Sequence, residues 1–445
     1  MAINDLRSFL DALRRENQLK EIENPVDIKF ELAAIARKAE MADMPALLFK
    51  NVKGYSIPVA INLISTMKRI SIALEIDDVN KVISHITPAF DNPVKEKMVS
   101  DGPVKENNIP EEKIDIAKNL PIPVHALKDN GPFISAGVVI GKDPESGRLN
   151  LSYNRMQVKG PRKLGIHIDP WRHLGDFYKK AEEQGKPLDI AIAIGLDPAI
   201  ELAAAARVPY SEFQLAGALR GRPIELVSGE TVDVEYPANA EIVIEGRILP
   251  KIREPEGPFA EFTGYYGISY KEPVVEVTHI VHRNEPIYRT IYGGSQEHLI
   301  LGNVISREPV LYKLAKHVDP NVVAVHIPPY TAGFHAIIST KKTIEGLTKN
   351  LIFAALTSHI NIKHVIIVDD DVNIYDAKDV LWAIATRVQG DKDIIIIPGA
   401  YGHWLDRTSD NGITTKVGID ATKPLSKAKE FERVSWKDVN LSEFI

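Results

Sequence analysis

The spacing of apolar residues changes twice along this chain of 445 residues, and each change restricts the fold. Up to about residue 100, apolar residues recur at helical intervals beside short apolar runs. From residues 134 to 281, alternating and β-branched runs predict a strand-rich region. After about residue 302, apolar strands alternate with helical stretches, which is typical of a largely parallel sheet covered by helices. We therefore expect a multidomain α/β protein.

Local signals predict the individual elements. Leu6, Phe9 and Leu13 recur at helical spacing and predict a first helix, and the preceding Asn4 and Asp5 can cap it. A charged stretch with several prolines, residues 102–123, is expected to link the first two regions. Further helices are expected at residues 30–41, 198–207, 211–220, 343–358 and 377–388. Strands are expected at residues 46–49, 57–63, 136–140, 149–158, 190–194, 242–244, 274–281, 322–327, 336–339, 365–368 and 394–397.

Composition excludes several classes of function. The formal net charge is -6 and no long basic block occurs, so nucleic-acid binding is not expected. The chain contains no cysteine, which excludes disulfides, thiolate metal sites and thiol nucleophiles. No segment approaches the roughly 20 apolar residues of a membrane span, and the first 15 residues do not form a signal peptide. We expect a soluble, cytoplasmic protein.

Two glutamates stand close together after an expected strand. Glu256 and Glu261 flank a turn that contains Gly257 and Pro258. Two neighbouring acids beside a cation can have separated pKa values, so that one of them donates a proton at neutral pH. Taken alone, the pattern also fits an acidic turn that faces solvent.

A polar strand, residues 150–155, offers a cation that could serve such acids. Alternation places Asn150 and Ser152 on one face, and Arg155 on the other unless a bulge or the strand end re-aims it. A guanidinium can orient a carboxylate or bind a phosphate through two hydrogen bonds. The alternative is the solvent-facing side of an edge strand.

Three further patterns could bind a metal or an anion. His173 and Glu212, together with Asn150, would form a nitrogen and oxygen set suited to Mn²⁺ or Mg²⁺, although the spacing does not require a metal. Three acids, residues 369–371, follow an expected strand and could serve a metal or substrate site, or could cap and form hydrogen bonds. Lys416 could reach a phosphate or could face water.

The order and spacing of these segments resemble those of the UbiD family of decarboxylases, which depend on prenylated FMN. The similarity extends from about Asn150 to Thr422. The matching segments are Asn150 with Arg155, His173, Ser211–Glu212 with Ala216–Gly217, Pro237–Gly246, Pro255–Glu261, Val368–Asn373, and Lys416 with Gly418–Thr422. Seven segments in the same order make a chance similarity improbable.

The resemblance implies a fold of three domains. These are an N-terminal α/β domain in residues 1–115, a central split β-barrel like that of flavin reductases in residues 116–305, and a C-terminal α/β domain used in oligomerisation in residues 306–445. A homodimer or homohexamer is therefore expected. A flavin prenyltransferase would supply the cofactor.

The resemblance also implies roles for individual residues. The implied metal is Mn²⁺, bound against the flavin phosphate, and a K⁺ ion is left open as a second metal. The implied metal ligands are Asn150, His173 and Glu212; the cofactor contacts are Asn150, Ser152, Arg155, His173, Glu212 and Lys416; and the catalytic residues are Arg155, Glu256 and Glu261.

The implied reaction is the reversible, non-oxidative decarboxylation of an α,β-unsaturated or (hetero)aromatic carboxylic acid. The cofactor accepts the electrons that CO₂ loss leaves on carbon. Glu261, near apolar neighbours, is expected to protonate that carbon, while Arg155 positions the substrate carboxylate and pairs with an ionised Glu256.

His298 and Arg307 follow the catalytic segment and could bind a second anionic group of the substrate, or could face solvent. Anhydromevalonate phosphate and a furan diacid are examples of such substrates. Two other functions stay open, namely an FMN-binding oxidoreductase and a subunit of a multi-subunit carboxylase.

Overall fold

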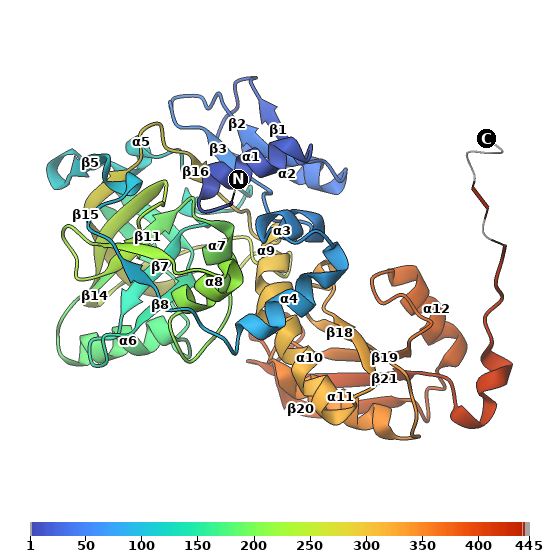
Figure 1. The fold of residues 1–445 in the computed structure, drawn as a ribbon. Coiled ribbons are helices and arrows are strands. Elements are labelled where there is room, and N and C mark those ends of the chain that lie inside the picture. The colour runs from blue at the N-terminus through green and yellow to red at the C-terminus, as the bar shows by residue number, and fades with distance from the viewer. Residues whose placement is uncertain (1, 438, 441–445) are drawn as a thin grey trace. The chain divides into compact units, whose positions relative to one another are not determined.

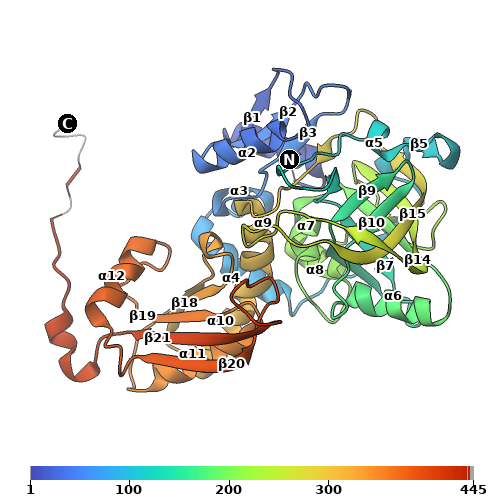
Figure 2. The same cartoon turned by 180° about the vertical axis from the view of Figure 1, so that it is seen from behind.

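The computed structural model describes residues 2–437 and 439–440 and divides into two compact units. The first contains Met1–Val310 and Pro329–Gly333, and the second contains Leu311–Pro328 and Phe334–Ile445. Figures 1 and 2 show the elements from opposite sides. The architecture is the expected multidomain α/β fold.

A small α/β layer begins the first unit. The first helix starts at Leu6 because Asp5 accepts a hydrogen bond from the Ser8 amide, and its apolar face, including Phe9, is buried. The helices are α1 (Leu6–Arg15), α2 (Glu31–Met41), α3 (Met67–Ala73) and α4 (Val82–Ala89). The sheet has the order β1 (Leu19–Ile22), β2 (Ala46–Phe49), β3 (Val59–Ile61) and β16 (Tyr288–Arg289). Its last strand therefore comes from the far end of the first unit.

A nine-stranded antiparallel sheet forms the centre of the first unit. The strand order is β6 (Phe133–Ile134), β9 (Met156–Gly160), β10 (Lys163–Ile166), β15 (Tyr270–His282), β14 (Ile242–Glu256), β11 (Leu188–Ile194), β7 (Val138–Lys142) and β8 (Leu149–Tyr153), and β5 (Asn107–Pro110) pairs with β15. Strands β8 and β9 lie near opposite ends of this order, yet only two residues join them. The Cα atoms of Tyr153 and Met156 are three steps of about 3.8 Å apart and so at most about 11 Å from one another, and the sheet must curl until its ends approach. This is the expected split barrel.

Two expectations about this region are corrected. The single strand expected at residues 149–158 is two strands, because the chain crosses from one end of the sheet to the other at Asn154 and Arg155. The expected linker, residues 102–123, contributes β5 to the sheet and also contains α5 (Ile116–Asn119). Its prolines and charges hid a four-residue strand whose partner is more than 160 positions away.

Helices and a small sheet complete the first unit. Ser211 caps α8 through the Phe213 amide, and Gly221, with φ +67°, ends the helix in the left-handed conformation. The helices are α6 (His173–Glu183), α7 (Pro198–Ala204), α8 (Glu212–Arg220) and α9 (Gln296–Ile300), followed by a π-helical turn (Leu301–Ile305). Helix α10 (Ser306–Val318) begins in the first unit and continues into the second, which starts at Leu311. The small sheet has the order β13 (Glu235–Pro237), β12 (Glu225–Ser228) and β4 (Lys97–Met98).

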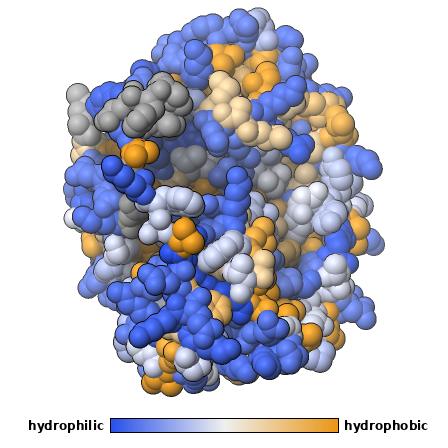
Figure 3. Space-filling view, turned by 90° about the vertical axis from the view of Figure 1, so that its right-hand side faces the viewer, coloured by the Kyte–Doolittle hydropathy of each residue, from blue (hydrophilic) through white to orange (hydrophobic). Residues whose placement is uncertain are grey.

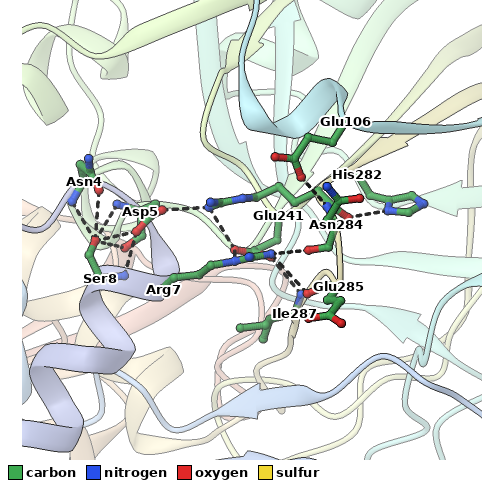
Figure 4. A network of polar contacts seen from close by, with 11 residues as sticks. Asn4, Asp5, Arg7, Ser8, Glu106, Glu241, His282, Asn284, Glu285 and Ile287 are labelled. Atoms are coloured by element: carbon green, nitrogen blue, oxygen red, sulfur yellow. Dashed lines mark hydrogen bonds and ion pairs between the residues drawn. The ribbon is translucent and has the colours of Figure 1, made fainter.

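A polar network joins α1 to the start of β14, as Figure 4 shows. The Glu241 carboxylate is buried and accepts hydrogen bonds from Nε and Nη2 of Arg7, both at 2.9 Å. It also accepts one from the Ile287 amide at 3.0 Å, and Arg283 links it to Asp5. The matching segment Pro237–Gly246 therefore has a structural function at this position.

The second unit is a five-stranded sheet with a helix on each face. The order is β17 (Val322–His326), β18 (His335–Thr340), β19 (His364–Asp369), β21 (Ile413–Ala421) and β20 (Ile394–Tyr401). The three central strands are parallel and the two edge strands are antiparallel to their neighbours. Helix α11 (Leu347–Ser358) packs beside Ile338 and Ile367, and α12 (Ala377–Arg387) packs beside Ile337 and Ile366. The expected helix-covered parallel sheet is present, although β21 had not been expected.

The surface carries no described helix that is long and apolar enough to cross a membrane. On the face drawn in Figure 3, hydrophilic residues predominate and apolar residues form small separate groups.

Candidate active site

Arg155 lies at the seam of the curled sheet, between the end of β8 and the start of β9. Its Nε and Nη2 donate hydrogen bonds to Oε1 and Oε2 of Glu256, both at 3.1 Å, and its Nη1 donates to Glu261. The strand end has re-aimed Arg155, as the sequence had left open. One guanidinium therefore holds two carboxylates that come from positions more than 100 residues later in the chain.

The two glutamates occupy a turn that is buried. Glu256 is the last residue of β14, and Glu261 lies five residues later in the connection to β15. Their exposed fractions are 0% and 6%, so the alternative of a solvent-facing turn is wrong. Gly257 between them has φ +91°, a conformation that glycine adopts without steric cost.

Burial and charge act in opposite directions on Glu261. Burial raises the pKa of its carboxyl, and the nearby charge of Glu256 raises it further, whereas Arg155 and His167 lower it. Phe259 lies 5.5 Å from the Arg155 guanidinium and supplies part of the apolar surroundings. Glu261 thus combines a raised pKa with a fixed cationic neighbour.

The structure adds two residues that sequence reasoning missed. Nδ1 of His167 lies 2.7 Å from Oε1 of Glu272, and the His167 carbonyl accepts a hydrogen bond from Asn154 Nδ2 at 2.8 Å. His167 and Glu272 are 105 positions apart, so no local pattern connects them.

A second cluster contains the three residues expected to bind a metal. Nδ1 of His173 lies 3.1 Å from Oδ1 of Asn150 and 4.0 Å from Oε1 of Glu212. His173 and Glu212 are the first residues of α6 and α8, and Asn150 lies on β8. Ligands at right angles around an ion with bonds of about 2.1 Å lie about 3 Å apart. The distance from His173 to Asn150 is close to that value, and the distance from His173 to Glu212 is about 1 Å longer.

The electrostatics of this second cluster fit a divalent cation. Burial raises the pKa of the Glu212 carboxyl to about 7, and burial lowers the pKa of His173. A bound cation would favour the ionised carboxylate and the neutral imidazole alike. Across residues 2–437 and 439–440, no three His, Cys, Asp or Glu side chains gather as a metal site, so Asn150 would have to be the third protein ligand.

Side chains along β8 connect the two clusters. Asn150 Nδ2 lies 3.4 Å from Ser152 Oγ, which donates to Asn154 Oδ1 at 2.7 Å. Asn154 immediately precedes Arg155. A ligand that contacts Asn150 and Ser152 would therefore lie along the strand that leads to the acids.

The two residues suggested for substrate binding lie in the same unit and are partly buried. His298 lies on α9, where its ring contacts Phe262 edge-on at 6.3 Å. Burial lowers the pKa of His298 to about 4, and burial together with the charge of Arg172 lowers the pKa of Arg307 to about 9.

The remaining candidates lie in the second unit. Lys416 is on β21, where its buried Nζ donates to the Leu356 carbonyl at 2.7 Å, and a cofactor contact stays a prediction. Asp369 and Asp371 both accept hydrogen bonds from the buried guanidinium of Arg387. Two residues of the acidic run thus form ion pairs with Arg387, which neither interpretation of the sequence had named.

Comparisons with known proteins agree with this architecture over most of the chain. Three family models match in order: the 3-octaprenyl-4-hydroxybenzoate carboxy-lyase N-terminal domain at residues 10–86, its Rift-related domain at residues 96–296 and its C-terminal domain at residues 301–421. An anhydromevalonate phosphate decarboxylase of Methanothermobacter thermautotrophicus is 40% identical over 437 residues, which cover 97% of this chain and 99% of the relative.

Solved structures agree equally well. The UbiD-class enzyme HmfF from Pelotomaculum thermopropionicum, in complex with FMN, has a TM-score of 0.95 and 45% identity, with 99% of this chain and 100% of that chain covered. An evolved dimeric form of the same enzyme, in complex with prFMN, has a TM-score of 0.92 and 43% identity at the same coverage. The chain therefore belongs to the UbiD family of carboxy-lyases.

Proposed function

We propose that this protein removes CO₂ from an α,β-unsaturated or (hetero)aromatic acid with the help of prenylated FMN, and that Glu261 is the proton donor. The observation that carries the proposal is the arrangement at Arg155, where one guanidinium binds two buried carboxylates. Burial raises the pKa of one of them, Glu261, so this acid keeps a proton at higher pH than an ordinary glutamate does.

Asn150, His173 and Glu212 would hold Mn²⁺ against the cofactor phosphate, and Ser152 lies beside them on β8. Prenylated FMN, when bound, would accept the electron pair that departing CO₂ leaves behind. The donor types and their spacing support this assignment. Glu212→Ala should abolish retention of the flavin during purification, and unchanged flavin occupancy would remove Glu212 from the site.

The chain's own residues have separate tasks in the reaction. Arg155 orients the substrate carboxylate, because a guanidinium matches a carboxylate with two parallel hydrogen bonds. Glu256 keeps this guanidinium in place through two contacts of 3.1 Å. Glu261 delivers its proton to the carbon that has lost CO₂, and it removes the same proton when the reaction runs toward carboxylation.

The proposed substrate carries a second anionic group, which His298 and Arg307 would bind. His298 and Arg307 are partly buried, and Arg172 is near enough for its charge to lower the pKa of Arg307. An anion would relieve the repulsion between these cations. Anhydromevalonate phosphate and a furan diacid both have this chemistry. Three relatives named anhydromevalonate phosphate decarboxylase are 38% to 40% identical to this chain.

Proton donation by Glu261 is tested with Glu261→Gln in the flavin-loaded protein. The variant should lose at least about a hundredfold of its turnover and of the H/D exchange at the product carbon, since general acid catalysis contributes roughly 10²–10⁴ in rate. The matched control is Glu276→Gln, which changes an exposed carboxylate on β15 and should have little effect. Full turnover of Glu261→Gln with the cofactor bound would contradict the assignment.

The substrate class is tested with the same holo-protein. CO₂ release is measured for anhydromevalonate phosphate, a furan diacid and the corresponding acids that lack the second anionic group. We expect release only from acids with two anionic groups, and Arg307→Met should raise KM for these more than it lowers kcat. Equal turnover of the acids without a second anion would contradict this role of Arg307.

Two other functions are separated by direct measurements. An FMN-binding oxidoreductase would hold unmodified FMN, which the mass and absorption spectrum of the bound flavin reveal. A subunit of a multi-subunit carboxylase would be inactive when purified alone, whereas the proposal requires that the single chain suffices.

A further inference from the structure

The turn between the two glutamates is held by side chains from two other segments. Gln157 on β9 accepts a hydrogen bond from the Gly257 amide at 3.1 Å with Oε1, and its Nε2 donates to the Asn130 carbonyl. Gln157 is 3% exposed. Its amide thus connects the start of the turn to the segment that contains Asn130.

That segment contacts the same turn through three more hydrogen bonds. The Asp129 carboxylate accepts one from the Ala260 amide at 2.9 Å. The same carboxylate is fixed within its own segment by a hydrogen bond from the Ala126 amide at 2.8 Å. Asn130 Nδ2 donates to the Gly257 carbonyl at 3.0 Å, and the Asn130 amide donates to the Pro258 carbonyl at 3.0 Å. The fourth residue of the turn, Phe259, accepts a hydrogen bond from the Gly267 amide at 2.8 Å. Backbone groups of all four residues between Glu256 and Glu261 are therefore engaged from outside the turn.

These hydrogen bonds, together called the clamp, concern the acids because Gln157 lies close to Arg155 in the chain. Arg155 immediately precedes β9, and Gln157 is the second residue of that strand. Arg155 contacts the two carboxylates, while Gln157 contacts the backbone between them. Glu256 is the last residue of β14, whereas Glu261 follows the turn, where its amide donates to the Tyr265 carbonyl at 2.9 Å. The contacts to the turn therefore fix the backbone on the side of Glu261 that leads back to Glu256.

We propose that Gln157 and Asp129 are positioning residues. They hold the turn so that the Glu261 carboxyl stays at a fixed distance from Arg155 and points toward the reacting carbon. This inference rests on the proposed role of Glu261 as the proton donor. The groups that face Glu261 are Arg155, His167 and Glu256. A loosened turn would admit water to them, and burial is the largest cause of the raised pKa of Glu261.

The test is Gln157→Met in the full-length, flavin-loaded protein, because methionine keeps the length of the side chain and adds no charge. We expect kcat to fall about tenfold to a hundredfold, as a displacement of about 1 Å at a reacting group does, with KM changed less than threefold. The pH at which kcat declines should move lower, toward the ordinary range of a glutamate. Flavin occupancy should be unchanged.

A second variant keeps the test decisive if Gln157→Met does not fold. Asn130 is exposed, and Asn130→Ala removes only its hydrogen bond to the Gly257 carbonyl. We expect a smaller loss of kcat with the same shift in the pH profile. The matched control is Asn92→Ala, since Asn92 is exposed and donates to the Pro88 carbonyl at 2.8 Å away from the turn.

The outcomes separate this inference from the proposed function. Unchanged kcat and pH profile in a folded variant would overturn the positioning role, and so would a loss of kcat that follows the loss of thermal stability without any shift in the pH profile. If the wild-type holo-protein released CO₂ from none of the acids tested, the proposed function would fail first. The titration of Glu261, followed by carboxyl ¹³C NMR in wild type and variant, would then still decide whether the clamp positions this carboxyl.

Discussion

Burial and the charge of Arg155 change the pKa of Glu261 in opposite directions. Burial favours its protonated form, and Arg155 favours its ionised form. Since burial is the larger effect, the pKa lies above the ordinary value of a glutamate. The same arrangement allows the residue to donate a proton and to recover it.

The pH dependence of turnover follows from this shift. A proton donor must be protonated, so kcat should be high at pH values below the pKa of Glu261 and should fall as the pH rises through it. Because that pKa is raised, the falling limb should lie at higher pH than the titration of a solvent-exposed glutamate. The measurement is kcat against pH for the holo-protein at saturating substrate. A rate that rose through this range would show that Glu261 acts in its ionised form.

The space around Glu261 gives a second prediction at this scale. A Cβ atom added at Gly267 would lie 2.7 Å from Oε1 of Glu261, which is closer than contact distance. Gly267→Ala should push the carboxyl away from Arg155 and lower kcat about tenfold or more. Gly160→Ala is the control, because the nearest atom there would be 3.9 Å away. Equal activity of the two variants would mean that Glu261 tolerates displacement.

The residues of the site differ in how far the sequence could predict them. Arg155, Glu256 and Glu261 were singled out by type and local spacing, but only the resemblance placed them together. Gln157 and His167 were missed, because their partners lie about 100 positions away. A sequence pattern relates residues that are close along the chain. Which distant residues come into contact depends on how the sheet curls.

At the scale of elements, prediction succeeded where one periodicity dominated. The helix at α2 and the strand at β2 have nearly the expected bounds. Strand β5 was missed because its prolines and polar residues are typical of a linker, and tertiary pairing with β15 decides its conformation. The break between β8 and β9 was missed because both halves alternate, and only the closure of the barrel separates them.

The attachment of α1 can be tested through its polar network (Figure 4). Glu241 is fully buried and paired with Arg7, so Glu241→Gln leaves cationic donors with a neutral partner. We expect the free energy of unfolding to decrease by roughly 2 kcal/mol, and the midpoint of thermal unfolding to fall accordingly. The control is Glu23→Gln, whose exposed pair with Lys50 at 3.5 Å should contribute little. Equal midpoints would show that α1 is held by its apolar face alone.

At the scale of the whole molecule, the compact units do not follow the order of the expected domains along the chain. After the barrel, the chain returns to the N-terminal layer as β16, which pairs with β3. The first 310 residues therefore form one compact unit. Strand β16 has only two residues, which is too short to be recognised from the sequence. The domain boundaries at residues 115 and 305 stay a prediction.

The expected self-association can be argued from the edge of the second unit. In the described part of the chain, β20 pairs on one side only, with β21. Ile395 and Ile397 pack against the core of this unit, so alternation leaves Ile394 and Ile396 on the uncovered face, where Ile396 is 65% exposed. Exposed apolar residues on an edge strand invite pairing with another chain.

We therefore predict that a second copy of this chain covers the β20 face in a homodimer or a larger homo-oligomer. Ile396→Lys places a charge at a position that the partner would bury. Burying an unpaired charge is strongly unfavourable, so the variant should weaken association. The variant should shift toward the monomer mass in size-exclusion chromatography with light scattering, at unchanged flavin content. Ile252→Lys is the matched control, because Ile252 is a 45% exposed isoleucine on β14 of the first unit. If wild type and Ile396→Lys had the same mass, association would have to use a different surface, because a buried lysine without a partner would not leave the interface intact.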